Sequence, residues 1–244
     1  MNNGNEYEKK ITGYPSIDKP WLQYYSEGAI REAVPEGSMY EYMHAQNEHY
    51  LFLNAISYYG RKITYGQLEE NIVKCAKALV GMGIKKGDTV SFNMLSIPET
   101  VYLLYAVNRI GAICNFPVMS GTAEEIGKQI RSTNSKIVIT IDIAAEKIKE
   151  ALYGNDVKVV VVGMDRWMSF PLTVFGKNKR SKEGNWLDWK GFIAQGMAVS
   201  DMRYPMIGMV DVIGIGAITK AGFYRDMRER HDRGATVYNP IREF

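Results

Sequence analysis

The sequence predicts an α/β protein in which a parallel sheet is covered by helices on both faces. Short apolar runs alternate with amphipathic helical patterns from about residue 60 to residue 165. Val157–Val162, where valine occupies every position but one, is the clearest of these runs. Strands that are apolar on both faces and alternate with helices are typical of parallel sheets buried between two helical layers. Right-handed crossovers are expected between the strands.

Composition sets the class of protein. The 244 residues, 46% hydrophobic and 23% charged, are ordinary for a globular protein with a sizeable core. A net charge of +3 implies no general attraction to nucleic acid or to an anionic membrane. The N-terminus lacks the apolar core of a signal peptide, and no run approaches the roughly 18 apolar residues of a membrane span. Cys75 and Cys114 lie in apolar patterns, which predicts buried free thiols and a cytoplasmic location.

The first 58 residues form the first predicted region, an aromatic-rich segment that wraps the following domain. Within it, Met39–Gln46 predicts a short helix with Met39, Tyr42 and Met43 on one face. Leu51–Tyr58 predicts a strand, and Lys62–Ile63 its hairpin partner.

A punctuated helix opens the second predicted region, residues 59–200. Thr64 and Gln67 have the spacing of a capping box, in which each side chain satisfies a free backbone N–H. Gly81 and Gly83 offer a left-handed stop. An apolar stripe at helical spacing lies between these signals, made by Leu68, Ile72, Cys75, Ala76 and Leu79.

The rest of this region predicts alternating strands and helices. Pro98 and Glu99 open a helix that is apolar nearly all round, and Thr122 with Glu125 repeats the capping-box spacing before another. The predicted strands are Val90–Met94, Ala112–Val118, Lys136–Ile141 and Val157–Val162; the predicted helices are Pro98–Ile110, Thr122–Thr133, Ala144–Tyr153 and Trp186–Ile193.

Three stretches of this region carry a family resemblance: GRKITYGQLEENIVKCAKAL (60–79), GIKKGDTVSFNMLSIPETVYLLYAVNRIGAICNFPV (83–118) and NSKIVIT (134–140). Together they resemble the N-terminal part of the adenylate-forming superfamily, the AMP-dependent synthetases and ligases that include acyl-CoA synthetases. The resemblance implies ligation of a fatty-acid-like carboxylate to coenzyme A through an acyl-adenylate. It also implies ATP, Mg²⁺ and coenzyme A as requirements of full-length members.

The motifs that carry this chemistry in the family are not found in the sequence. They are a glycine-rich phosphate loop ending in Pro-Lys-Gly, an aromatic-x-x-Thr-Glu motif, a ribose-binding aspartate and a lysine of a mobile C-terminal domain. The sequence therefore predicts no catalytic, cofactor-binding or metal-binding residue and an incomplete N-terminal subdomain. Residues 201–244 are the third predicted region, a tail outside the family pattern, and we expect translation out of frame from about Pro205.

Two glycine-containing stretches invite a phosphate-binding interpretation. Ser120–Gly121–Thr122 looks like part of a phosphate loop, but the capping role of Thr122 is favoured because no further glycines or lysine follow at the required spacing. Gly214 and Gly216 resemble the start of a dinucleotide fingerprint, whose third glycine is replaced by Thr219.

Three histidines and one aspartate are candidate ligands elsewhere in the sequence. His44 and His49 are five residues apart, which does not place them on one helical face, and His231 lies in a charged run. Asp142 follows a predicted parallel strand, where α/β proteins often bind ligands, although a helix cap or loop role is favoured.

Two basic clusters predict solvated surface. Asp226, Glu229 and Asp232 nearly cancel the arginine-rich tail, which argues against nucleic acid. The basic residues concerned are Lys177, Lys179, Arg180 and Lys182 in a loop, and Arg225, Arg228, Arg230 and Arg233 in the tail.

Two functions stay open. The first is a truncated acyl-CoA synthetase, inactive alone, which would meet a carboxylic acid, ATP and coenzyme A only when the missing portion is supplied. The second is a non-catalytic remnant or a binding subunit that pairs with a separately encoded remainder. An oxidoreductase is disfavoured because no glycine-rich turn follows the strand near Met94. We also expect self-association through an exposed sheet edge.

Overall fold

The computed structural model describes residues 11–31, 37–164, 185–200, 204–205 and 214–216. The chain divides into two units, Met1–Pro35 and Glu36–Phe244, and each is considered by itself. The carboxylate of Asp18 closes a turn in the first unit by accepting hydrogen bonds from the backbone N–H groups of Thr12 and Gly13, both at 2.9 Å. The helical turns of this unit are α1 (Pro15–Asp18), η1 (Pro20–Tyr24) and α2 (Glu27–Arg31).

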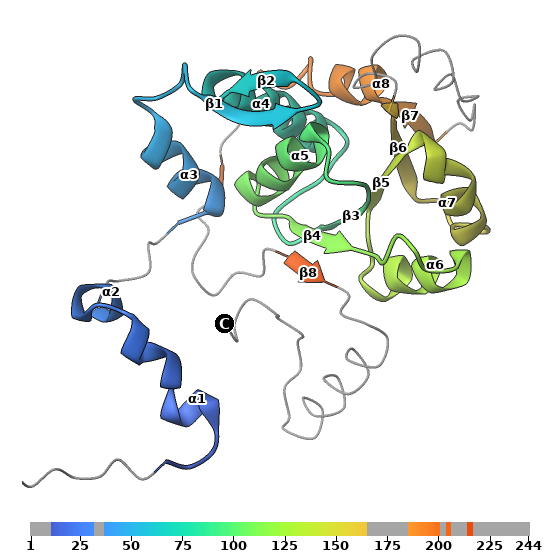
Figure 1. Cartoon of the computed structure of the whole chain (residues 1–244). Helices are drawn as coiled ribbons and strands as arrows, with labels where there is room; N and C mark the ends of the chain where they lie inside the picture. Colours follow the sequence, from blue (N-terminus) through green and yellow to red (C-terminus); the bar gives the residue numbers. More distant parts are fainter. Residues whose placement is uncertain (1–10, 32–36, 165–184, 201–203, 206–213, 217–244) are drawn as a thin grey trace, which may run out of the picture. The chain divides into compact units, whose positions relative to one another are not determined.

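The second unit contains a parallel sheet of six strands in the order β7-β6-β5-β3-β4-β8 (Figure 1). Every neighbouring pair in this sheet is parallel. A separate antiparallel hairpin, β1 with β2, precedes it. The strands are β1 (Asn54–Tyr58), β2 (Arg61–Thr64), β3 (Thr89–Asn93), β4 (Ile113–Phe116), β5 (Ile137–Ile141), β6 (Lys158–Val162), β7 (Trp186–Asp188) and β8 (Gly214–Gly216).

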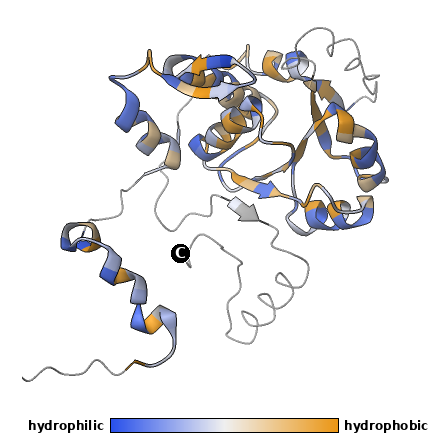
Figure 2. Cartoon of the chain, viewed as in Figure 1, coloured by the Kyte–Doolittle hydropathy of each residue, from blue (hydrophilic) through white to orange (hydrophobic). Residues whose placement is uncertain are grey.

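Helices cover both faces of this sheet, which confirms the predicted fold class. They are α3 (Met39–Asn47), α4 (Tyr65–Gly81), α5 (Pro98–Arg109), α6 (Ala123–Ser132), the turn η2 (Asp142–Ala144), α7 (Ala145–Ala151) and α8 (Trp189–Ala194). The buried side chains form two clusters, one with α4, α5 and α8 and the other with α6 and α7. Alternation along β5 explains the division, because Ile137 and Ile139 join the first cluster while Val138 joins the second. Figure 2 shows the apolar character of the central strands between these layers.

The punctuation of α4 is the one that the sequence predicts. Thr64 and Gln67 form the reciprocal capping box, and Gly83 adopts a left-handed φ of 93° beyond the helix. Gly81 has another role, because it ends the helix without a left-handed conformation. A Cβ atom at Gly81 would overlap the backbone of Gln195, so this glycine lets α8 approach α4 closely.

Two local predictions are wrong. Trp186–Ile193 was expected to be one helix, but its first three residues form β7, which pairs with β6, and α8 starts only at Trp189. Asp188 separates the two by accepting a hydrogen bond from the backbone N–H of Gly191 at 2.8 Å. In α3, Tyr40 is buried whereas Tyr42 of the predicted apolar face is 53% exposed.

The aromatic-rich segment also departs in part from its prediction. Tyr40 joins the core, but Tyr50, Phe52 and Tyr59, which were expected to be tucked against the domain, are exposed. The segment boundary at residue 58 and the tail boundary at residue 201 stay predictions. Gly214–Gly216 of the predicted tail pairs with Cys114–Phe116, so these three residues extend the sheet beyond β4.

Candidate functional site

The order of the strands defines one place in the sheet where a parallel α/β protein offers a crevice. From β3 the chain moves to β4 on one side, then returns across β3 to β5 and continues away through β6 and β7. The two directions diverge between β3 and β5. Ligands of open α/β sheets bind outside the carboxyl ends of the strands at such a switch point. The carboxyl edge of β3, β4 and β5 is therefore the candidate site.

Asn93, the last residue of β3, is the most unusual side chain at this edge. It is completely buried, yet neither its amide nitrogen nor its amide oxygen has a hydrogen-bond partner among the described residues. Thr140 of the neighbouring β5 donates its hydroxyl to the backbone oxygen of Asn93 at 3.2 Å. A buried amide without partners costs free energy, so this position calls for an explanation beyond packing. No local sequence pattern marks Asn93 as functional, since it ends a strand that is otherwise apolar or small.

Asp142 lies at the same edge, at the end of β5. One carboxylate oxygen accepts a hydrogen bond from the backbone N–H of Ile143 at 2.9 Å, and the other accepts one from Met164 at 3.3 Å. The carboxylate thereby joins the loop after β5 to the loop after β6. Asp142 has the loop role that the sequence favours over ligand binding.

The N-terminus of α6 is closed by its own side chains. The hydroxyl of Thr122 accepts from the backbone N–H of Glu125 at 3.2 Å, and the carboxylate of Glu125 accepts from the N–H of Thr122 at 3.1 Å. Ser120–Gly121–Thr122 is thus a helix cap, as predicted. Backbone N–H groups already used in this way do not cradle a phosphate.

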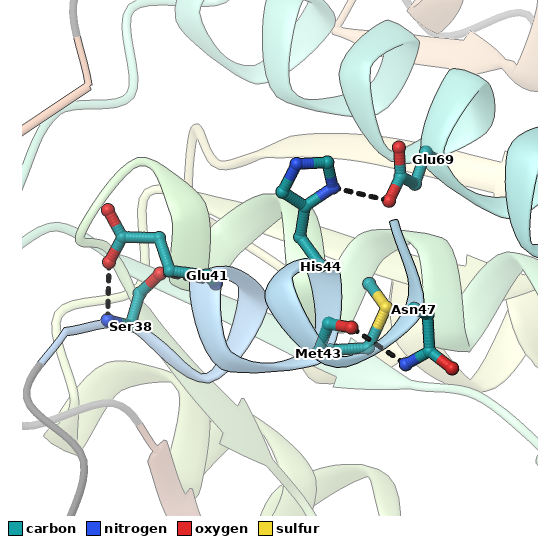
Figure 3. A network of polar contacts seen from close by, with 6 residues as sticks. All are labelled: Ser38, Glu41, Met43, His44, Asn47 and Glu69. Atoms are coloured by element: carbon teal, nitrogen blue, oxygen red, sulfur yellow. Dashed lines mark hydrogen bonds and ion pairs between the residues drawn. The ribbon is translucent and has the colours of Figure 1, made fainter. Parts of the chain in front are cut away.

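His44 is paired with a single carboxylate and not with a set of metal-ligating side chains. Its Nδ1 lies 2.6 Å from Oε1 of Glu69, which joins α3 to α4 (Figure 3). His49 lies 3.4 Å from Glu48. Among the described residues, no group of three histidine, cysteine, aspartate or glutamate side chains could hold a metal ion.

A stacked arrangement that no local sequence pattern predicts lies at the C-terminal end of α5. The guanidinium of Arg109 lies between the rings of Tyr40 and Tyr204, at 4.2 and 3.9 Å from their centroids. Cation–π contacts of this kind tie α3 and the segment at Tyr204 to α5. Burial raises the pKa of both tyrosines, and the nearby positive charge of Arg109 opposes that rise.

A cavity of about 360 Å³ lies beside this stack, away from the carboxyl edge. Lys85 and Lys86 precede β3 and Ile110 precedes β4, so the cavity opens at the amino ends of these strands. Its other lining residues are Val80, Ile84, Tyr204 and Pro205. The cavity and the switch point are therefore separate features.

The remaining candidate site residues either have surroundings that do not favour a reaction or a ligand, or lie outside the described residues. Cys75 and Cys114 are buried free thiols, and burial raises the pKa of Cys114, which disfavours a nucleophilic thiolate. Gly214–Gly216 lies in a strand and not in a strand-to-helix turn. No described helix is long and apolar enough to cross a bilayer. Outside the described residues lie Lys177, Lys179, Arg180, Lys182, Thr219, Arg225, Arg228, Arg230, His231 and Arg233.

Comparison with curated proteins finds acetyl-coenzyme A synthetases. The chain is 41% identical over 83 residues to acetyl-coenzyme A synthetase 1 of Debaryomyces hansenii, a match that covers 34% of this chain and 12% of that enzyme. It is 40% identical over 82 residues to the acetyl-coenzyme A synthetase of Methylocella silvestris, with 34% and 13% covered. The matched part is thus a small fraction of each relative.

Solved structures of two ligases share the fold. A benzoate CoA ligase from Burkholderia xenovorans superimposes with a TM-score of 0.57 at 17% identity, over 72% of this chain and 32% of that one. Coronafacic acid ligase from Pectobacterium brasiliense gives a TM-score of 0.59 at 21% identity, over 73% and 33%. The chain spans about a third of each ligase. Residues 44–196, more than half of the sequence, match the family of AMP-binding enzymes, and the chain belongs to that family.

Proposed function

We propose that this chain is the N-terminal α/β framework of an AMP-forming carboxylate–coenzyme A ligase for a fatty-acid-like acid. The observation that carries the proposal is the family match over residues 44–196, which includes every strand of the parallel sheet except β8. The sheet supports the proposal by providing a switch-point edge between β3 and β5. The buried thiols fit a reducing cytoplasm.

The described residues do not fit Mg²⁺–ATP. They contain no cluster of carboxylates or histidines for the metal, and the backbone N–H groups of Thr122 and Glu125 at the start of α6 are already bonded within its capping box. The phosphate loop and the C-terminal lysine of the family are also missing from the sequence. We therefore expect ATP, Mg²⁺ and coenzyme A to be held by the remainder of a ligase, with no step of the reaction carried by these residues alone.

An exchange assay tests this proposal. The purified chain is incubated with ATP, Mg²⁺, labelled pyrophosphate and, in turn, acetate, benzoate or a long-chain fatty acid. We expect no acid-dependent exchange into ATP, because the family's phosphate loop and C-terminal lysine, which would bind and stabilise the phosphates, are missing from the sequence. The full-length Methylocella silvestris enzyme with acetate serves as the positive control. Robust exchange by the chain alone contradicts the proposal.

The second function is that of a subunit completed by a separately encoded remainder. The chain corresponds to only 32–33% of the two solved ligases, which favours a framework that requires further polypeptide. The DNA downstream of Pro205 gives a direct test, since a frame that encodes a glycine-rich phosphate loop supports out-of-frame translation of the tail. If no reading frame of the downstream DNA encodes such a loop, the hypothesis of out-of-frame translation is wrong.

A further inference from the structure

The cavity at the amino ends of β3 and β4 is separate from the sheet edge that the proposed function uses. Its volume of about 360 Å³ is in the range of small-molecule sites. Such sites combine apolar walls with a few polar groups that orient the ligand, and this cavity has both. The apolar walls come from Val80, Ile84, Ile110 and Pro205, and the charged groups are those of Lys85 and Lys86.

The turn that carries the two lysines is held in place by the turn after α5. The backbone N–H of Gly87 donates to the backbone oxygen of Gly111 at 2.8 Å. Gly111 has a left-handed φ of 72°, and a Cβ atom there would lie 2.9 Å from Cγ of Lys86 and 3.1 Å from Cγ of Pro205. The aliphatic stem of Lys86 therefore packs closely on this glycine. A cavity wall that is ordered before a ligand arrives lowers the entropic cost of binding.

Positive charge dominates the surroundings of the cavity. The described residues that line it include Lys85 and Lys86 and no acidic side chain. The guanidinium of Arg109 lies 3.9 Å from the ring centroid of Tyr204, a lining residue, and its Nη1 is buried without a hydrogen-bond partner among the described residues. Asp88 is the acid of the same turn, and its carboxylate accepts the backbone N–H of Lys85 at 2.9 Å. Three cations near one acid favour an anionic ligand.

The backbone of the turn favours a carboxylate over a phosphate. Phosphate sites use free backbone N–H groups or a bidentate guanidinium. Here the N–H groups of Ile84, Lys85 and Gly87 already donate to protein oxygens, at 3.0, 2.9 and 2.8 Å. The guanidinium of Arg109 is held between two aromatic rings. Two ammonium groups beside apolar walls suit a single carboxylate with an apolar body.

We propose that this cavity binds an aliphatic carboxylate, at a site separate from the switch-point edge. The carboxylate lies between the ammonium groups of Lys85 and Lys86. The aliphatic chain packs against Val80, Ile84 and Ile110, and its burial supplies affinity while the lysines select the charged head group. Binding here needs neither ATP nor coenzyme A, so the proposal does not depend on the ligase function.

Calorimetric titration of the full 244-residue chain with octanoate tests the proposal. We expect saturable binding with a Kd on the order of 0.1 mM. Octan-1-ol, which lacks the charge, and octyl phosphate, which carries the other head group, should both bind more weakly. The double variant Lys85→Gln, Lys86→Gln keeps the length of the side chains as far as glutamine allows and should weaken octanoate binding on the order of 10-fold.

The matched control removes the same charge elsewhere. Lys62 and Lys190 are exposed lysines that do not line the cavity. Lys62→Gln with Lys190→Gln should leave the Kd within about twofold of the wild-type value. Circular dichroism and thermal unfolding establish that both double variants keep the wild-type fold.

Amide NMR spectra of the isotopically labelled chain locate the ligand. Octanoate should shift the signals of residues 84–87 and 110–111, which surround the cavity. It should leave residues 93–95 at the carboxyl end of β3 unchanged. Shifts confined to residues 93–95 overturn the cavity site but leave the proposed ligase function standing, since that edge is the one it uses.

The other outcomes are equally decisive. Absence of saturable octanoate binding up to about 2 mM overturns the proposal. Equal binding of octan-1-ol overturns the role of the lysines, and tighter binding of octyl phosphate overturns the choice of a carboxylate. Equal weakening in the two double variants overturns the location. Pyrophosphate exchange tests the ligase function alone, so its failure leaves the cavity site intact.

Discussion

At the scale of single residues, a buried polar network links β3 to β4 and to the end of α6. Ser91 is fully buried, with its hydroxyl 2.7 Å from that of Ser135 and accepting a hydrogen bond from Asn115 at 2.7 Å. Asn115 and Ser135 each have a further contact to Thr133. Such networks stabilise one register only when every member is satisfied.

Ser91→Ala tests this network. The substitution should lower the free energy of unfolding by about 1–2 kcal/mol, because Asn115 loses an acceptor in a site that water does not reach. Urea unfolding measures the effect as a lower midpoint with an unchanged slope. Ser96→Ala, at an exposed position, should change stability by less than about 0.5 kcal/mol. Equal effects of the two substitutions would show that the network contributes nothing.

Cys114 gives the chain a pH-dependent stability. Burial raises the pKa of its thiol in the folded state above the ordinary value of 9.0. This stabilisation is fully present below the unfolded pKa and is lost as pH rises towards the folded pKa. The free energy of unfolding should therefore fall above pH 9.0, by up to about 1.4 kcal/mol per pH unit. Urea titrations between about pH 8 and about pH 10 measure it, and Cys114→Ala should remove that part of the slope.

Residue-scale features differ in how well the sequence predicts them. The capping pairs of Thr64 and Thr122 were predictable because both partners lie within one helical turn. The stack of Arg109 between Tyr40 and Tyr204 joins residues far apart in the chain, which only the tertiary fold brings together. Asn93 could not be recognised either, since the lack of a partner is a property of its surroundings.

At the scale of elements, the close approach of α8 to α4 depends on glycine. A Cβ atom at Gly81 would overlap the backbone oxygen of Gln195, and one at Gly196 would lie 2.7 Å from the backbone nitrogen of Ala78. The local pattern predicts a helix stop at Gly81, because glycine favours that position. The actual constraint comes from α8, whose place next to α4 no local pattern reveals.

Gly81→Ala distinguishes these two roles. Alanine is the better helix former by about 1 kcal/mol. Gly81 does not have a left-handed φ, so if it served only to end the helix, alanine at this position would not destabilise the protein. Overlap with Gln195 instead predicts a loss of roughly 1–3 kcal/mol. Gly66→Ala in the same helix has room for a Cβ, 3.4 Å from the nearest atom, and should not destabilise. Thermal unfolding of both variants provides the comparison, and a stabilised Gly81→Ala contradicts the packing role.

The elements that were predicted best are those with strong local periodicity and clear ends. The strand β5 and the helix α4 are apolar at the expected spacing and lie within a residue or two of their predicted bounds. The sequence predicts a helix over all of Trp186–Ile193, because its three aromatic residues lie at helical spacing. Its first part is a strand because β6 offers a free edge for pairing, and tertiary pairing overrides the local pattern.

At the scale of the whole molecule, the sheet ends on one side in a very short strand. The edge strand β7 has three residues between Asn185 and the start of α8 at Trp189, which leaves few backbone groups for pairing with another chain. The predicted self-association through a strand edge stays a prediction.

The division of the chain into two units leads to the last prediction. Within residues 11–31, no described side chain is buried, and Tyr24 is 83% exposed. Apolar burial is the main source of folding free energy, so this segment has no apolar core of its own among its described residues. We expect deletion of residues 1–35 to shift the thermal midpoint of the remaining chain by less than about 2 °C. Scanning calorimetry of the full chain and the shortened chain measures this shift. A drop of about 5 °C or more would mean that Met1–Pro35 stabilises Glu36–Phe244, as the predicted wrapping segment requires.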